Sequence, residues 1–133
     1  MALTNSSDYF TVQAIDTGDE QIVVVKGEID LAAAEPLWRV ITSVLARGPK
    51  RLVIDMVDTT FLDSSGLEVL LRAHAALGRL PEATVLRTPS PPVRRVLELA
   101  GVVDFFAYDG DGDGDGTYDG DGGGDRRDGS GGT

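Results

Sequence analysis

The fold of this chain is decided by residues 57–71, which read VDTTFLDSSGLEVLL. Immediately before them, Arg51–Asp55 has the short, β-branched character of a buried strand. Towards their end, apolar residues begin to recur at helical spacing, at Leu67, Leu70, Leu71, His74 and Leu77. The small polar residues between the two patterns predict a strand-to-helix corner.

Asp63 and Ser65 are the residues that can cap the new helix, because their side chains accept hydrogen bonds from backbone N–H groups of the first turn. Ser65 and Glu68 also fit an S-x-x-E capping box. The corner therefore places the hydroxyls of Ser64 and Ser65 at a helix N-terminus, where negative charge is favoured. A phosphoryl group on Ser64 would lie beside the repelling carboxylate of Asp63, so we predict that modification changes this surface.

The negative charge of the chain is concentrated at its C-terminal end. The 133 residues carry a formal net charge of −10. From Asp109 onward the sequence contains eight aspartates and only two arginines. A mildly acidic body without a basic stripe argues against nucleic acid or an anionic membrane surface as the partner. The absence of cysteine from the sequence excludes disulfides, thiol chemistry and cysteine-based metal sites.

One domain is expected at this length. No basic segment followed by an apolar run opens the sequence, and no apolar run approaches the ~20 residues that span a bilayer, so we expect a cytoplasmic protein. Residues 1–8 are expected to be a flexible N-terminus and residues 9–108 the domain. Residues 109–133 are an Asp/Gly-rich low-complexity tail that we expect to be disordered, because it cannot bury enough apolar surface to offset its entropy.

The rest of the sequence predicts alternating strands and helices after an initial hairpin. The order β-β-α-β-α-β-α-β, with right-handed crossovers, predicts an α/β fold with a mainly parallel or mixed sheet covered by helices. The first helix accommodates Pro36 only if this residue lies in its first turn. The expected strands are 9–16, 21–26, 51–55, 83–86 and 105–107, and the expected helices are 33–46, 64–77 and 91–100.

Other kinds of site are less favoured by the sequence. No G-x-S-x-G elbow surrounds the serines, so His74 is interpreted as a partly buried structural residue and not as part of a Ser-His-Asp hydrolase. Trp38 fits either the core or an exposed interface. Asp111–Gly116 matches the opening of an EF-hand loop, but the twelfth position is Gly122, where a bidentate glutamate is needed.

Three segments together resemble the STAS-domain family of anti-sigma factor antagonists, or anti-anti-sigma factors. Gly27–Leu31 (GEIDL) resembles a segment ahead of the family's first helix, Phe61–Leu67 (FLDSSGL) matches its D-S-S-G-L signature, and Val93–Gly101 (VRRVLELAG) resembles its third helix. The resemblance covers nearly all of Phe10–Tyr108 and implies a STAS-like mixed β-sheet with helices packed against it. Many family members end with a fourth helix, where this chain has Gly–Asp repeats.

The resemblance also implies a phosphorylation switch. In the family, the first serine of the signature, here Ser64, is phosphorylated by an anti-sigma factor that is also a serine kinase of the histidine-kinase-like ATPase fold. The unmodified antagonist binds this partner and frees a sigma factor, the phosphorylated form dissociates, and a serine phosphatase resets it. The chain would be a substrate and not an enzyme, without a cofactor of its own, because Mg-ATP belongs to the kinase. By position, the partner-binding surface would include Asp30, Asp63, Ser65, Gly66 and Leu67.

Three alternatives stay open at this point. Ser64 and Ser65 can serve as helix caps and nothing more. The chain can be a STAS interaction or ligand-sensing module that is not phosphorylated. The acidic tail can also make it a Ca²⁺-responsive protein, although a solvated acidic tail is the simpler interpretation.

Overall fold

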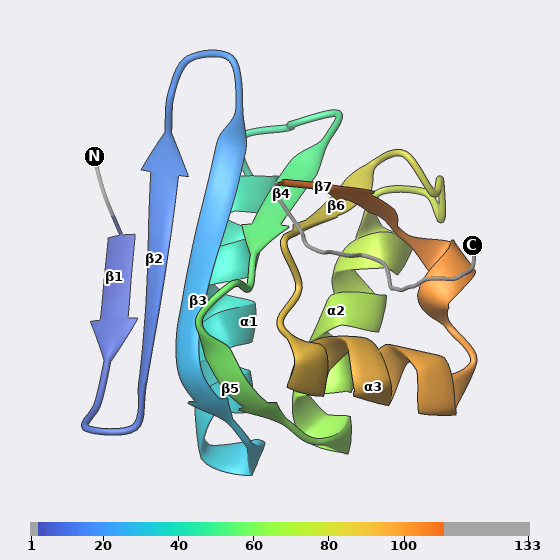
Figure 1. The fold of residues 1–133 in the computed structure, drawn as a ribbon. Helices are drawn as coiled ribbons and strands as arrows, with labels where there is room; N and C mark the ends of the chain where they lie inside the picture. Colours follow the sequence, from blue (N-terminus) through green and yellow to red (C-terminus); the bar gives the residue numbers. More distant parts are fainter. Residues whose placement is uncertain (1–2, 111–133) are drawn as a thin grey trace.

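A computed structural model describes residues 3–110 of the 133-residue chain. In this part of the chain, seven strands form one sheet in the order β1-β2-β3-β4-β6-β7, and β5 pairs with β3 alone (Figure 1). The predicted α/β class with a mixed sheet is confirmed. The elements in chain order are β1 (Leu3–Ser6), β2 (Phe10–Asp16), β3 (Gln21–Ile29), α1 (Leu31–Leu45), β4 (Leu52–Asp55), β5 (Thr59–Leu62), α2 (Ser64–Ala76), β6 (Thr84–Arg87), α3 (Pro91–Ala100), the 3₁₀ turn η1 (Val103–Phe105) and β7 (Ala107–Asp109).

The sheet changes from antiparallel to parallel at β3. β1, β2 and β3 are antiparallel neighbours, whereas β4 and β5 both run parallel to β3. Parallel neighbours need a crossover connection, and α1, α2 and α3 supply these connections. The carboxyl ends of β3 and β5 therefore meet at the edge of the sheet where α1 and α2 begin.

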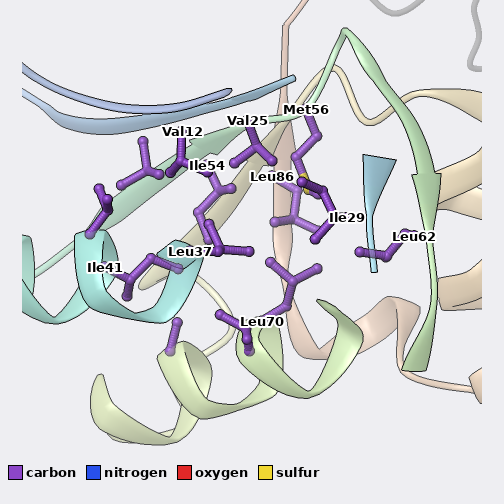
Figure 2. Close-up of a cluster of buried hydrophobic side chains, with 14 of the residues drawn as sticks. Val12, Val25, Ile29, Leu37, Ile41, Ile54, Met56, Leu62, Leu70 and Leu86 are labelled. Atoms are coloured by element: carbon purple, nitrogen blue, oxygen red, sulfur yellow. The ribbon is translucent and has the colours of Figure 1, made fainter. Parts of the chain in front are cut away.

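The main core lies between the sheet and the helices α1 and α2. Figure 2 shows Val12, Val25, Ile54 and Leu86 on the strands and Leu37, Ile41 and Leu70 on the helices, gathered in one cluster. On α1 the buried positions recur three and four residues apart, as expected of a helix with one apolar face. These positions are Ala33, Leu37, Val40, Ile41 and Val44.

A second, smaller apolar cluster lies on the opposite face of the sheet, because side chains of successive strand residues point to opposite faces. Ile22, Val53, Val85 and Ala107 are register partners across β3, β4, β6 and β7 and form one row. No described helix lies over the side of β2 and β3 that faces the viewer in Figure 1. Val53 and Val85 are nevertheless only 1% and 2% exposed.

The structure extends the sheet beyond both predicted limits of the domain. Residues 1–8 were expected to lie outside it, but Leu3–Ser6 forms β1 and pairs with Thr11–Ala14 of β2. Asp109 was expected to open the tail, but it is the last residue of β7. The predicted disorder and the EF-hand-like segment at 111–122 lie outside the described residues.

The prediction that β3 ends at Lys26 is wrong, because the strand continues to Ile29 through a register shift at Gly27. Gly27 has a φ of +91°, and a Cβ there would collide with the carbonyl oxygen of Tyr9. The longer strand brings Asp30 to the start of α1, which therefore begins at Leu31 and not at residue 33. Pro36 consequently lies beyond the first turn, contrary to the prediction.

Two short elements also differ from the prediction. The polar corner was predicted as a turn but contains a strand, β5. The last strand was expected at 105–107, whereas Val103–Phe105 forms a 3₁₀ turn and the strand spans Ala107–Asp109. Both strands have only three or four residues, which is too short for a period of two to be recognised in the sequence.

Candidate functional site

The corner around Ser64 is held by the side chain of Asp63. Asp63 is the N-cap of α2, and its Oδ1 accepts hydrogen bonds from the backbone N–H groups of Ser65 (2.8 Å) and Gly66 (3.3 Å). The prediction of a capping box that starts at Ser65 is wrong, because Ser65 is already the second residue of the helix. The carboxylate of Glu68 instead lies 3.9 Å from the guanidinium of Arg72.

Ser64 is the first residue of α2 and is exposed. Within residues 3–110 its hydroxyl makes no hydrogen bond, so it is available to a second molecule. The placement of Ser64 and Ser65 at a helix N-terminus is confirmed. Because Asp63 already occupies the N–H groups of Ser65 and Gly66, these groups are not free to neutralise an anion on Ser64.

A second helix begins beside the first. Asp30 is the N-cap of α1, and its Oδ1 accepts from the N–H groups of Ala32 (3.0 Å) and Ala33 (3.3 Å). The backbone N–H of Asp63 donates to the carbonyl oxygen of Ile29 at 3.2 Å, which joins the two corners. The structure thus brings Asp30 and Asp63 to one edge of the sheet as two capping carboxylates.

The other predicted site residues of the corner are partly or fully buried and pack between it and the core. Gly66 is buried, and a Cβ at this position would collide with the side chain of Leu62 and lie 2.8 Å from Cγ2 of Ile29. Ser65 and Leu67 are half-buried, and Leu67 packs against the main core. Among the six residues proposed from the sequence, Ser64 is exposed and the remaining five are half-buried or buried.

β5, which leads into the corner, is held from below by the start of α3. The hydroxyl of Ser90 donates to the carbonyl oxygen of Thr59, and the hydroxyl of Thr59 donates to the carbonyl oxygen of Val25 at 2.8 Å. The backbone N–H of Ser90 donates to the carbonyl oxygen of Met56 at 3.2 Å. These three bonds connect β3, β5 and α3, and so they position the residues before Ser64.

Two exposed apolar residues near Ser64 were not proposed as site residues. Phe61 on β5 is 48% exposed, and Leu31, the first residue of α1, is 75% exposed. On β5 the side chain of Leu62 is buried in the core, whereas its neighbour Phe61 is turned away from the core.

His74 has the structural role that was predicted for it. It lies in the last turn of α2, is 7% exposed and stacks on Phe105 with ring centroids 5.3 Å apart. Ser64 is at the opposite end of the same helix, roughly 15 Å away at the helical rise per residue. These two side chains therefore cannot form a catalytic pair. Trp38 is half-buried, with the guanidinium of Arg72 5.4 Å from its ring centre.

A surface hollow beside α3 lies apart from the predicted site residues. It has a volume of about 150 Å³ and is lined by Arg94, Leu97, Glu98, Val103 and Tyr108. Sites for small organic ligands usually measure ~300–1,000 Å³, so this hollow gives the ligand-sensing alternative little support. In residues 3–110 no group of three or more His, Cys, Asp or Glu side chains is arranged to hold a metal ion. None of the described helices is both long and apolar enough to cross a membrane.

Comparison with known proteins identifies the family. Residues 11–113 match the STAS domain family. The chain belongs to the STAS domain family. The sheet, the three helices and the serine corner described above are therefore those of a STAS domain.

Relatives of this STAS domain carry a common name. The chain is 33% identical over 98 residues to the anti-sigma-F factor antagonist RsfB of Mycobacterium tuberculosis. This match covers 74% of this chain and 80% of RsfB. An anti-sigma factor antagonist from Mycobacterium paratuberculosis superimposes with a TM-score of 0.68 at 31% identity, over 78% of this chain and 88% of that one. The anti-sigma factor antagonist SpoIIAA in its unphosphorylated form gives a TM-score of 0.60 at 26% identity, over 73% and 86% of the two chains. SpoIIAA of Bacillus in its phosphorylated form gives 0.56 at the same identity, over 73% and 89%.

Proposed function

We propose that this STAS domain is a cytoplasmic anti-sigma factor antagonist that controls transcription by switching partners. In its unmodified form it binds an anti-sigma factor that is also a serine kinase of the histidine-kinase-like ATPase fold, and a sigma factor is released. Phosphorylation of Ser64 ends this binding, and a serine phosphatase restores it. The chain is the substrate of both enzymes and catalyses neither step.

The observation that carries the proposal is the exposed hydroxyl of Ser64 at the first position of α2. A kinase has to bring the γ-phosphate of ATP in line with the attacking hydroxyl, which requires an accessible and well-positioned serine. Ser64 is accessible, and the cap of Asp63 together with the bonds that anchor β5 holds it in position. The existence of a phosphorylated form of SpoIIAA, a structural neighbour, is consistent with this role.

The local charges support an effect of phosphorylation on binding. A phosphoryl group adds nearly two negative charges, and the backbone N–H groups of Ser65 and Gly66 are already bonded to Asp63. The added charge therefore stays at the surface, beside the carboxylates of Asp63 and Asp30. Bringing such a cluster into a packed interface opposite the phosphates of the kinase's nucleotide costs both desolvation and repulsion, which lowers the affinity.

The test is intact-mass analysis after incubation with Mg-ATP and each candidate anti-sigma kinase of the source organism. We expect wild-type protein to gain one phosphoryl group and the Ser64→Ala protein to gain none. Ser43→Ala is the control, because it removes a serine hydroxyl of α1 outside the proposed partner-binding residues, and it should be modified like the wild type. Binding of each kinase to wild-type and phosphorylated protein then measures the switch.

Two results would contradict the proposal. One is a phosphoryl group on the Ser64→Ala protein at the level of the wild type, which would place the modification elsewhere. The other is the absence of modification by kinases that are active on other antagonists. With binding retained in that second case, the chain would be a STAS interaction module that works without phosphorylation.

A further inference from the structure

Large exposed apolar side chains lie on backbone segments that meet at the end of the sheet that carries Ser64. Leu31 is 75% exposed, Tyr9 69%, Val57 49% and Phe61 48%. Backbone contacts join the segments that carry them. The N–H of Glu28 donates to the carbonyl oxygen of Tyr9 at 2.8 Å, and Glu28 is the register partner of Phe61 across β3 and β5.

The fold does not require Leu31 and Phe61 to be apolar. Leu31 is the first residue of α1, whose core-facing positions begin at Ala33. Phe61 lies beside Leu62, which is 3% exposed and fills the core in its place. Exposed apolar side chains that gather in one place on a soluble domain mark interaction surfaces. Because Leu31 and Phe61 lie close to an accessible serine, binding of another protein best explains why these exposed residues are apolar.

The same surface is acidic. Asp8, Glu28 and Asp58 are exposed, and none of the three forms an ion pair within residues 3–110. Asp30 and Asp63 add two further carboxylates as helix caps. A partner surface that is complementary to this one has basic residues around an apolar recess.

We infer that Leu31 and Phe61 are the apolar anchors for the anti-sigma kinase, and that Glu28 and Asp58 pair with basic residues around its recess. The inference rests on the proposed function and adds to it the residues that supply affinity independently of Ser64. A few residues that become fully buried near the centre of an interface carry most of its binding energy, whereas charges at its rim chiefly accelerate association.

In this arrangement the residues that provide binding affinity, Leu31 and Phe61, are different from the residue that controls binding, Ser64. Ser64 faces the nucleotide phosphates of the kinase, so a phosphoryl group there meets like charge. Phe61 lies three residues earlier on β5 and Leu31 follows the Asp30 cap, so both are placed to contact protein at the side of that site. Phosphorylation then opposes binding without altering the anchors themselves.

The experiment measures the dissociation constant between the unphosphorylated full-length chain and a candidate anti-sigma kinase. We expect Leu31→Ala and Phe61→Ala each to weaken binding at least tenfold. Leu99→Ala is the matched control, because Leu99 is also a helical leucine and is 77% exposed, but it lies on α3. It should bind within twofold of the wild type. Circular dichroism and thermal unfolding of each variant verify that the fold is retained.

The charges are tested by association kinetics. Glu28→Gln combined with Asp58→Asn should slow association and reduce its dependence on salt, with little effect on dissociation. Glu82→Gln combined with Asp104→Asn removes two exposed carboxylates elsewhere, in the loop before β6 and in η1, and is the control for the same change of net charge.

The outcomes separate the two proposals. A wild-type chain that binds none of the active candidate kinases overturns the proposed function, and the inference falls with it. A wild-type chain that binds, with Leu31→Ala and Phe61→Ala as tight as Leu99→Ala, overturns only the inference.

Discussion

Arg87 and Asp109 lie opposite each other on β6 and β7, and the guanidinium makes two hydrogen bonds with the carboxylate. Nε donates to Oδ1 at 2.9 Å and Nη2 to Oδ2 at 3.0 Å. The same Nη2 donates to Oε2 of Glu20 at 3.0 Å, and Arg51 approaches Asp109 at 3.8 Å. The bonds to Asp109 and Glu20 raise the pKa of Arg87 above its ordinary value. The guanidinium therefore stays charged throughout the pH range in which the protein is studied.

This network explains why Ile22, Val53 and Val85 are buried although, among residues 3–110, only strand residues form their cluster. Arg87 and Asp109 lie two residues beyond the row, whereas Glu20 and Arg51 lie two residues before it. The bonds that connect them therefore cross over the apolar side chains and cover them with the stems of two arginines.

Replacing Arg87 by methionine is expected to lower the free energy of unfolding by about 1–3 kcal/mol, because Asp109 and Glu20 both lose a charged donor. Urea denaturation measures the change. Arg39→Met is the control, since Arg39 and Glu35 form an exposed pair at 3.8 Å whose loss costs only about 0–0.5 kcal/mol. Equal losses in the two variants would show that the network contributes nothing to stability.

Two truncations test the role of the acidic tail. A chain that ends at Gly110 keeps Asp109 and should unfold at the temperature of the full-length chain, whereas one that ends at Tyr108 should be less stable. Titration calorimetry with Ca²⁺ should show no saturable binding to either the full-length chain or the chain ending at Gly110. A saturable heat that only the full-length chain gives would support the Ca²⁺-responsive alternative.

Gly66→Ala should destabilise the domain by about 1–3 kcal/mol, because the new Cβ would overlap Leu62 and crowd Ile29. The start of α2 must then move, so phosphorylation of Ser64 should slow as well. Ser65→Ala, one residue earlier, should change stability by no more than about 0.5 kcal/mol. If Gly66→Ala and Ser65→Ala had the same free energy of unfolding, the close packing around Gly66 would not contribute to stability.

Asp63 combines a capping role with a negative charge, and two substitutions separate them. Asp63→Ala removes the cap of α2 and should cost about 1 kcal/mol, whereas Asp63→Asn keeps an oxygen acceptor and should cost much less. If the charge of Asp63 opposes phosphoserine binding, phosphorylated Asp63→Asn should retain more affinity for the kinase than phosphorylated wild type. Affinity that is unchanged by Asp63→Asn would assign the switch to the phosphoryl group alone.

The serine corner could be predicted from the sequence because its signals are local. Asp63, Ser64 and the apolar spacing after Leu67 predict a helix start without reference to the rest of the chain, although they leave both Asp63 and Ser65 possible as its cap. β5 could not be predicted, because its pairing with β3 depends on the bulge at Gly27, which depends in turn on the approach of Tyr9. Asp109 likewise looked like part of the tail, since its partner Arg87 is distant in sequence. The buried position of Gly66 also follows from tertiary contacts and not from its place in the signature.

β4 and β5 both pair with β3, but they differ in how many strands they pair with. β4 pairs with a strand on each side, whereas the only strand that β5 pairs with in residues 3–110 is β3, through Gly27–Ile29. Separating β5 from β3 therefore breaks no other strand pairing, and the strands beyond it can stay together. Amide protons of Thr59–Leu62 should exchange with deuterium through a local opening, at a lower free energy than those of Leu52–Asp55. The strand that leads into the Ser64 corner would then open as a separate unit while the rest of the domain stays folded.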